Sequence, residues 1–247
     1  MIKNIFRAYR QQIFRRKVLQ TNKLILTDEP ILIIAPHPDD ETFGCAGLIA
    51  QKVNNGANIT VAFLTYGENS MKEVSDKEVA INRKKTSQDI CDMLGVENIH
   101  YCGLIDGKIP RRGSKNYKDA LKIVTELVEK VKPKEVFCTH VSEGWSDHTA
   151  AAELTKDALK YIDSNISLYY YWVWVWFSIP LKKINVLNFK DTYYLSIEDV
   201  LYEKKFAISK YLNSKDSNKK AYCGELPKMF LKAFEWPYEV FEKVEYK

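Results

Sequence analysis

The sequence has few of the cysteines that cross-link small or secreted domains through disulfide bonds or bound zinc. Its 247 residues include five cysteines, Cys45, Cys91, Cys102, Cys138 and Cys223, and no two of them form a Cys-x-x-Cys pair. The odd number argues against a disulfide framework, and the missing pair argues against a zinc site made of thiolates. We therefore expect the protein in a reducing compartment, the cytoplasm.

A hydrophobic run long enough to cross a membrane is also missing. The most apolar window, Leu168–Ile179, holds only a dozen residues, whereas a transmembrane helix needs about 20. The N-terminus has neither the continuous apolar core nor the small-residue cleavage site of a signal peptide. Repeats and low-complexity linkers are absent as well, so we expect one domain over residues 26–247, preceded by a basic segment over 1–25.

Acidic residues are absent from the first twenty positions, which carry six basic ones. Without these six, the net charge of +5 becomes slightly negative, so the rest of the chain is nearly neutral and no nucleic-acid partner is expected. Apolar residues of the segment recur at the spacings of an amphipathic helix: Ile2, Ile5, Phe6, Tyr9 and Ile13. This helix could lie on an anionic membrane surface, or it could pack on the protein body or on a second subunit. Packing is the more common role of a terminal amphipathic helix.

From residue 31 onward, strand and helix patterns alternate. Strands are predicted over 31–35, 58–66, 98–102, 135–139 and 193–197. Helices are predicted over 42–54, 76–94, 117–131, 147–162 and 197–212, and the apolar tail 229–241 is expected to pack back on them. This order with short loops is typical of the α/β class. We expect a Rossmann-like, mostly parallel sheet with helices on both faces.

The aromatic run Leu168–Ile179 contains three of the five tryptophans. Its alternation predicts a further strand, with one face formed by Tyr170, Trp172, Trp174 and Trp176. The simpler interpretation is a core strand with large side chains. The alternative is an aromatic wall against which a sugar ring or a lipid lies.

The turn after the first strand concentrates ionisable side chains: it reads Pro36-His37-Pro38-Asp39-Asp40-Glu41. In open parallel α/β sheets, ligands usually bind at such turns, at the carboxyl ends of strands. His37 and Asp40 can both reach one metal ion, which leaves Asp39 free to act as a base. The turn lacks Gly-x-Gly-x-x-Gly, and its carboxylates would repel a pyrophosphate, so a nucleotide-binding domain is disfavoured.

A second strand-to-helix junction, Ser146-Asp147-His148, offers another imidazole. His37, Asp40 and His148 together supply two imidazoles and a carboxylate, and they leave a coordination position open, as a catalytic zinc site requires. Zinc would lower the pKa of a water molecule, and Asp39 could take its proton. Asp147 would then orient a ligand by a hydrogen bond. Glu41 would do no more than favour the helix dipole.

The His-Pro-Asp-Asp-Glu motif at a strand end, with a later Asp-His pair opening a helix, resembles the PIG-L/LmbE-like family of zinc-dependent de-N-acetylases. The resemblance extends from about Ile31 to Leu212. Weaker supporting motifs are Leu64-Thr65-Tyr66-Gly67-Glu68, Arg83 before Leu94-Gly95-Val96, Asp106, and Glu203-Lys204-Lys205-Phe206-Ala207. The resemblance implies removal of the acetyl group from an N-acetylated amino sugar, which releases a free amine and acetate.

The resemblance also implies roles for individual residues. By position, the metal ligands, for one Zn²⁺ or another divalent ion, are His37, Asp40 and His148, and the general base is Asp39. Arg83 and Asp106 match positions that contact sugar hydroxyls, and a planar guanidinium and a carboxylate suit a polyol. The alternative for Arg83 is a solvated charge on a helix face that also carries Lys84 and Lys85.

One position departs from the family pattern. Many members read His-Pro-Asp-His where this chain reads Trp145-Ser146-Asp147-His148. The first histidine of that motif is thought to protonate the leaving amine or stabilise the oxyanion. The indole N–H of Trp145 can donate a hydrogen bond to a substrate but cannot transfer a proton. His140, at the end of the preceding strand, could replace that acid, and so could Asp39 by passing on the proton that it took from water.

The sequence therefore favours a metal-dependent deacetylase acting on an N-acetylamino sugar in a glycan, a glycolipid or a sugar conjugate. A thiol-precursor conjugate of N-acetylglucosamine is an alternative substrate, and the aromatic run with the basic N-terminal segment slightly favours a lipid-linked glycan. A non-catalytic alternative is a sugar-binding protein that keeps the metal site and has lost activity at Trp145. The sequence leaves the oligomeric state open.

Overall fold

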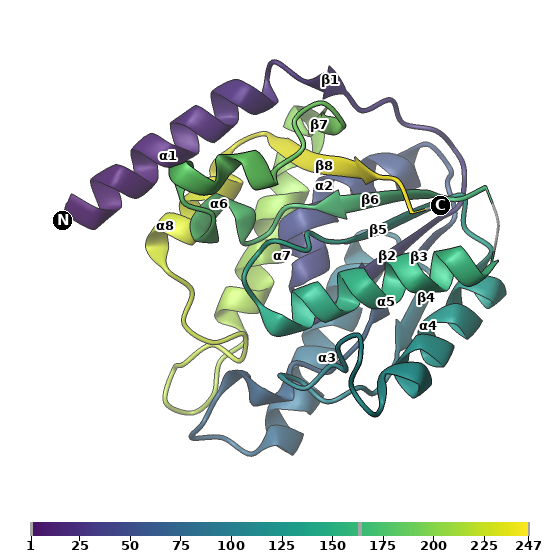
Figure 1. The fold of residues 1–247 in the computed structure, drawn as a ribbon. Helices are drawn as coiled ribbons and strands as arrows, with labels where there is room; N and C mark the ends of the chain where they lie inside the picture. Colours follow the sequence, from purple (N-terminus) through teal and green to yellow (C-terminus); the bar gives the residue numbers. More distant parts are fainter. Residues whose placement is uncertain (1, 163–164, 247) are drawn as a thin grey trace.

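The computed structural model describes residues 2–162 and 165–246, with side chains for 4–162 and 165–246. Its centre is an eight-stranded sheet in the order β1-β7-β8-β6-β5-β2-β3-β4 (Figure 1). The strands are β1 (Asn22–Lys23), β2 (Ile31–Ala35), β3 (Ile59–Phe63), β4 (Asn98–Tyr101), β5 (Glu135–Thr139), β6 (Ser167–Tyr171), β7 (Thr192–Ser196) and β8 (Tyr238–Val244). The expected α/β class with a mostly parallel sheet is confirmed.

The last strand, β8, is the exception to the parallel arrangement. It lies between β6 and β7 and runs antiparallel to both, whereas β1 to β7 pair only in parallel with one another. The sequence indicated that the C-terminal tail packs back but did not identify this strand. β8 joins β6 to β7 in the sheet, and its Val240 carbonyl oxygen accepts the N–H of Trp172, just after β6, at 3.2 Å.

Helices cover both faces of the sheet (Figure 1). They are α1 (Ile2–Val18), α2 (Asp40–Asn54), α3 (Asp76–Met93), α4 (Tyr117–Val131), α5 (Ser146–Ile162), α6 (Val175–Ser178), α7 (Leu201–Asn213) and α8 (Lys228–Leu231). Successive residues of β2 alternate between two cores: Ile31 and Ile33 pack with α2, α3 and α7, and Leu32 and Ile34 pack with α4 and α5. Both faces of β2 are therefore buried, which explains its continuous apolar run.

The aromatic run does not form the long strand that the alternation predicted. β6 ends at Tyr171, and the chain then turns into the short helix α6. The carboxylate of Glu143 accepts the backbone N–H groups of Val173, Trp174 and Val175 at 2.6, 2.7 and 3.2 Å. These N–H groups therefore bond to a buried side chain and not to a neighbouring strand. The expectation of a strand through Ile179 was wrong because this tertiary contact bends the backbone.

The N-terminal segment forms the expected helix, α1, and packs on the protein body. The face that packs differs from the expected one, because Phe14 and Val18 are fully buried whereas Ile5, Phe6 and Tyr9 are exposed. Ile13 is half-buried, and Ile2 lies outside the residues with described side chains. Within the described ranges, none of the helices has both the length and the apolarity to cross a bilayer.

Gly44 in α2 lies directly against the ring of Tyr171. A Cβ atom added at Gly44 would lie 2.2 Å from Cδ2 of that ring. The ring has little room to move, because Tyr171 is fully buried and its hydroxyl donates to the carbonyl oxygen of Ile34 at 3.0 Å. We expect Gly44→Ala to lower the free energy of unfolding by about 1–3 kcal/mol in urea denaturation. Asn54→Ala, at an exposed position of α2, should change it by less than about 0.5 kcal/mol; equal effects would contradict the close packing.

Candidate metal centre and active site

The turn between β2 and α2 is held in an unusual backbone conformation. Asp39 has φ 138° and ψ −28°, which a non-glycine residue rarely adopts. Its N–H donates to Oε2 of Glu41 at 2.8 Å, and Oε1 of Glu41 accepts the hydroxyl of Tyr211 at 2.8 Å. Glu41 is fully buried. It therefore does more than favour the helix dipole, since it fixes the backbone that aims Asp39 and Asp40.

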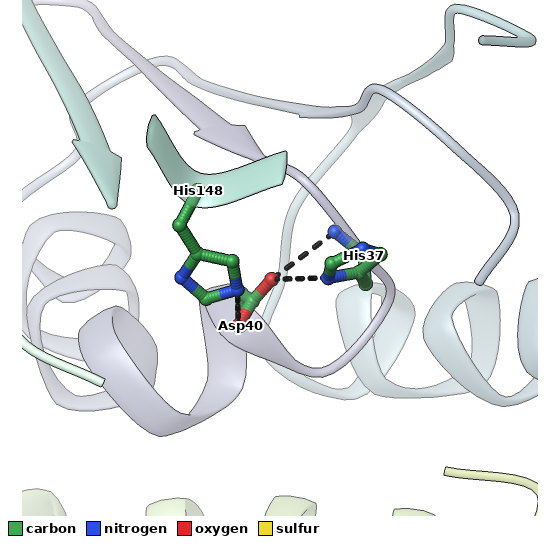
Figure 2. A group of neighbouring side chains, drawn as sticks. All are labelled: His37, Asp40 and His148. Carbon is green, nitrogen blue, oxygen red and sulfur yellow. Dashed lines mark hydrogen bonds and ion pairs between the residues drawn. The ribbon is translucent and has the colours of Figure 1, made fainter. Parts of the chain in front are cut away.

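Three side chains from two segments converge beside this turn. Figure 2 shows Asp40 between the two imidazoles: Oδ2 lies 3.2 Å from His37 Nδ1 and Oδ1 lies 3.4 Å from His148 Nε2. One potential ligand atom from each residue lies within 4.8 Å of the others. Two imidazole nitrogens and a carboxylate oxygen are suitable donors for a catalytic zinc ion. The residues therefore fit the metal that the sequence implied.

In both His37 and His148, the ring nitrogen that does not face Asp40 contacts another carboxylate. His148 Nδ1 lies 2.6 Å from Glu143 Oε2, and His37 Nε2 lies 3.0 Å from Asp106 Oδ1 and 3.2 Å from Asp147 Oδ2. Such contacts fix the tautomer and orientation of metal-binding histidines. Asp147 lies where the sequence suggested. Glu143 was missed, because a single glutamate in a loop carries no local signal of burial or of its partner.

The carboxylates also change the charge of the imidazoles. Burial lowers the pKa of His37, but hydrogen bonds to Asp106, Asp147 and Asp40 outweigh it and raise the pKa well above the ordinary value. Burial likewise opposes protonation of His148, and Asp40 and Glu143 raise its pKa nonetheless. The carboxylates around His37 and His148 thus stabilise positive charge at this site. Either protons on the imidazoles or a bound cation can supply that charge. Since a metal competes with these protons, its affinity should fall as the pH falls.

Asp39 lies beside this cluster but outside the group of possible ligands, and it pairs with Arg83. Asp39 Oδ2 lies 3.0 Å from a guanidinium nitrogen of Arg83. Burial raises the pKa of Asp39 to about 7 even though the Arg83 charge opposes the shift. A carboxyl group with such a pKa can both accept and return a proton near neutral pH.

Arg83 itself is buried, with 4% of its surface exposed. Its guanidinium donates to the carbonyl oxygens of Pro38 and Gly67. The alternative of a solvated charge on a lysine-rich helix face was therefore wrong. The arginine connects α3 to the turn that carries Asp39.

A cavity of about 400 Å³ opens over the cluster. The residues that line it include His37, Asp39, Asp40, Arg83, Asp106, Trp145, Asp147, His148, Trp174 and the segment 223–226. The rings of Trp145 and Trp174 lie 5.1 Å apart between centroids, and Trp145 is 48% exposed. An aromatic surface therefore borders the polar cluster. It comes from Trp145 and from the turn after β6, and not from a flat strand face.

The chain matches the model of the family PIG-L (GlcNAc-PI de-N-acetylase) over residues 32–159. That region is more than half of the sequence and contains both the His-Pro-Asp-Asp-Glu turn and the Asp147-His148 pair. The chain belongs to the PIG-L family.

The chain is also similar to curated proteins and to a solved structure. The chain is 29% identical over 138 residues to a probable N-acetyl-alpha-D-glucosaminyl L-malate deacetylase 2 of Bacillus subtilis, a match over 53% of this chain and 61% of that protein. It is 28% identical over 136 residues to the diacetylchitobiose deacetylase of Thermococcus kodakarensis, over 53% and 49% of the two chains. The structure of N,N'-diacetylchitobiose deacetylase from Pyrococcus horikoshii has the same fold, with a TM-score of 0.66 at 19% identity, over 87% of this chain and 84% of that one. The two sequence matches thus span about half to three fifths of the length of these curated relatives.

His140, which the sequence offered as a substitute for the missing family histidine, is not at this site. It is not among the residues that line the cavity, and 1% of its surface is exposed. Its Nε2 lies 3.1 Å from Glu242 Oε2 on β8, and its Nδ1 accepts the N–H of Ser142 at 3.0 Å. Both ring nitrogens are therefore engaged in holding the loop after β5. Of the two substitutes that the sequence offered, His140 is therefore the less favourable, because its ring faces β8.

Proposed function

We propose that this protein is a metal-dependent hydrolase that removes the acetyl group from an N-acetylated amino sugar. The convergence of His37, Asp40 and His148 beneath a cavity carries the proposal. Membership in the PIG-L family supports the reaction type. Of the two curated relatives described above, one is named as a probable N-acetyl-alpha-D-glucosaminyl L-malate deacetylase and the other as a diacetylchitobiose deacetylase.

The metal would be held by His37 Nδ1, a carboxylate oxygen of Asp40 and His148 Nε2. When bound, a divalent ion such as zinc would supply a Lewis acid for the acetyl carbonyl and would make a water molecule more acidic. Asp39 would accept the proton of the attacking water. Arg83 would hold the Asp39 carboxylate toward the cavity, since the two side chains are 3.0 Å apart.

The proton must then reach the amine that leaves when the carbon–nitrogen bond breaks. Trp145 stands at the family's histidine position and has no transferable proton, and His140 faces β8. Asp39, with its pKa raised to about 7, remains as the group that can give the same proton to the amine nitrogen. The products are the free amino sugar and acetate, and Asp39 returns to its ionised form.

The substrate would lie between the polar and aromatic sides of the cavity. The rings of Trp145 and Trp174 offer apolar faces to a sugar ring. Asp106, at the cavity wall, keeps carboxylate lone pairs for a sugar hydroxyl in addition to its bonds with His37 and the N–H of Asn69. Arg83, whose guanidinium already bonds to Pro38, Gly67 and Asp39, would position Asp39 rather than contact the sugar directly.

Acetate release from a panel of N-acetylglucosamine compounds would test the proposal. The panel should contain the free sugar, diacetylchitobiose, the L-malate glycoside and a lipid glycoside, because the named relatives differ in what is attached to the sugar. We expect release from at least one compound, loss of release after exhaustive chelation, and recovery when zinc is restored. Release that persists in metal-free protein would refute the metal-dependent mechanism. Sugar binding without release from any compound would indicate the non-catalytic alternative.

Glu143→Gln should weaken metal binding about 10- to 100-fold. One oxygen of Glu143 meets His148 Nδ1, and the other accepts three backbone N–H groups. A glutamine has only one acceptor oxygen, so either the imidazole or the backbone loses its partner. The affinity can be measured by competition with a chromophoric chelator. Glu153→Gln, the same change at an acid on α5 that pairs with Arg111, is the control, and an unchanged affinity in both variants would contradict the role of Glu143.

A further inference from the structure

The helix α1 is fixed to the protein through polar contacts. Arg10 donates to the carbonyl oxygens of Trp176 and Phe177 at 2.9 and 2.6 Å, and Gln11 donates to that of Met229 at 2.7 Å. Phe14 and Val18 are fully buried on the same side of the helix. These contacts join α1 to α6 and α8. These specific interactions therefore determine which face of α1 packs on the protein body.

In this orientation, the most apolar part of α1 points away from the protein body. Ile5, Phe6 and Tyr9 are 64%, 67% and 60% exposed. Tyr9 lies four residues after Ile5 and three after Phe6, so the three side chains form one stripe on the helix surface. Arg16 continues the stripe toward the C-terminal end and is also exposed. We call this stripe of Ile5, Phe6, Tyr9 and Arg16 the outer face of α1.

An apolar outer face next to cations fits the interface of an anionic membrane. Phenylalanine, isoleucine and tyrosine side chains enter the headgroup boundary, and basic side chains bind the headgroups. The first twenty residues carry no acid. Arg10 and Arg15 donate to carbonyl oxygens of the protein body, whereas Arg16 lies on the outer face and Lys17 next to it is exposed. A second copy of this helix would offer no acidic side chain to these cations. We infer that the outer face of α1 docks this protein on an anionic membrane surface.

The docked helix would bring the cavity close to that surface. α1 contacts both α6 and α8. Trp174, which lines the cavity, directly precedes α6, and Leu226, which also lines it, lies two residues before α8. Docking does not depend on the proposed reaction, and it can be measured in protein without substrate.

Flotation with phosphatidylcholine vesicles, with and without phosphatidylglycerol, tests the inference. We expect the protein to float with the anionic vesicles, to bind neutral ones at least about tenfold more weakly, and to dissociate as the salt concentration rises. The variant I5S/F6S/Y9S should bind anionic vesicles at least about tenfold more weakly. Arg16→Gln should weaken binding about fivefold.

The control variant replaces two exposed tyrosines away from α1, Tyr161→Ser and Tyr202→Ser, which are 75% and 76% exposed. It should bind anionic vesicles like the unchanged protein, and thermal unfolding should show that every variant is folded. Equal vesicle binding by the control and by I5S/F6S/Y9S would overturn the inference, as would no binding by the unchanged protein. A dimer in sedimentation that I5S/F6S/Y9S dissociates, without vesicle binding, would instead assign the outer face to a second copy.

Discussion

Asp40→Ala should abolish metal binding and deacetylation together. Among the residues that the structure describes, Asp40 alone contributes a carboxylate that pairs with both imidazoles of the proposed ligand set, at 3.2 Å from His37 Nδ1 and 3.4 Å from His148 Nε2. Its pKa is held below the usual range, because burial is outweighed by the two histidines, so the oxygen stays ionised and ready to bind a cation. Since a catalytic metal contributes several kcal/mol to such a reaction, we expect activity to fall at least about a thousandfold.

Elemental analysis of the purified variants, together with acetate release, would check this result. Asp89→Ala provides the matched control, because Asp89 is an exposed acid on α3. That variant should keep the metal and its activity. A stoichiometric metal content in Asp40→Ala would show that the metal binds elsewhere and would remove the proposed ligand set.

Asp39→Asn should leave the metal in place and lower kcat by about 100- to 10,000-fold, the range of general acid–base catalysis. An asparagine has nearly the same shape but cannot accept the proton of the attacking water. Because Asp39 would also return that proton to the amine, the loss should lie at the upper end of the range. Metal content and KM should change little, since Asp39 does not belong to the ligand set. A kcat within threefold of the unchanged protein would refute the role of Asp39.

The pH dependence gives a second check on Asp39. Its carboxyl group must be ionised to accept a proton, so kcat/KM should decline as the pH falls through the pKa of this group. Burial raises that pKa to about 7, and a bound cation would lower it, so the decline should begin at or below pH 7. The residual activity of Asp39→Asn should lack this acid limb. An acid limb of the same shape in both proteins would assign it to another group.

Glu143 links the proposed metal site to the aromatic border of the cavity. The same carboxylate meets His148 and the backbone N–H of Trp174. A change at Glu143 should therefore affect both metal affinity and the position of Trp174. This coupling explains why the run after β6 leaves the strand although its side chains alternate like those of a strand.

Local sequence was sufficient for the elements that depend on local patterns. The apolar run of β2 and the helix signals of α4 predicted those elements within a residue of their observed bounds. His37, Asp39 and Asp40 could be selected because they stand together in one turn at a strand end. His148 could be added because parallel strands place their carboxyl ends at the same edge of a sheet.

Contacts between distant segments decided the rest. The sequence by itself determined the α/β class, the turn with its candidate ligands and the charge of the N-terminal helix, because each follows from residues that are neighbours along the chain or on one helix. The tertiary structure alone decided that β8 enters the sheet, that Glu143 and Arg83 are buried beside the site, that His140 faces away, and that α1 turns its apolar stripe outward. Each of these depends on contacts between segments that are far apart in the sequence. Several partners would be chemically equivalent for each segment, and a local pattern does not indicate which of them it contacts after folding.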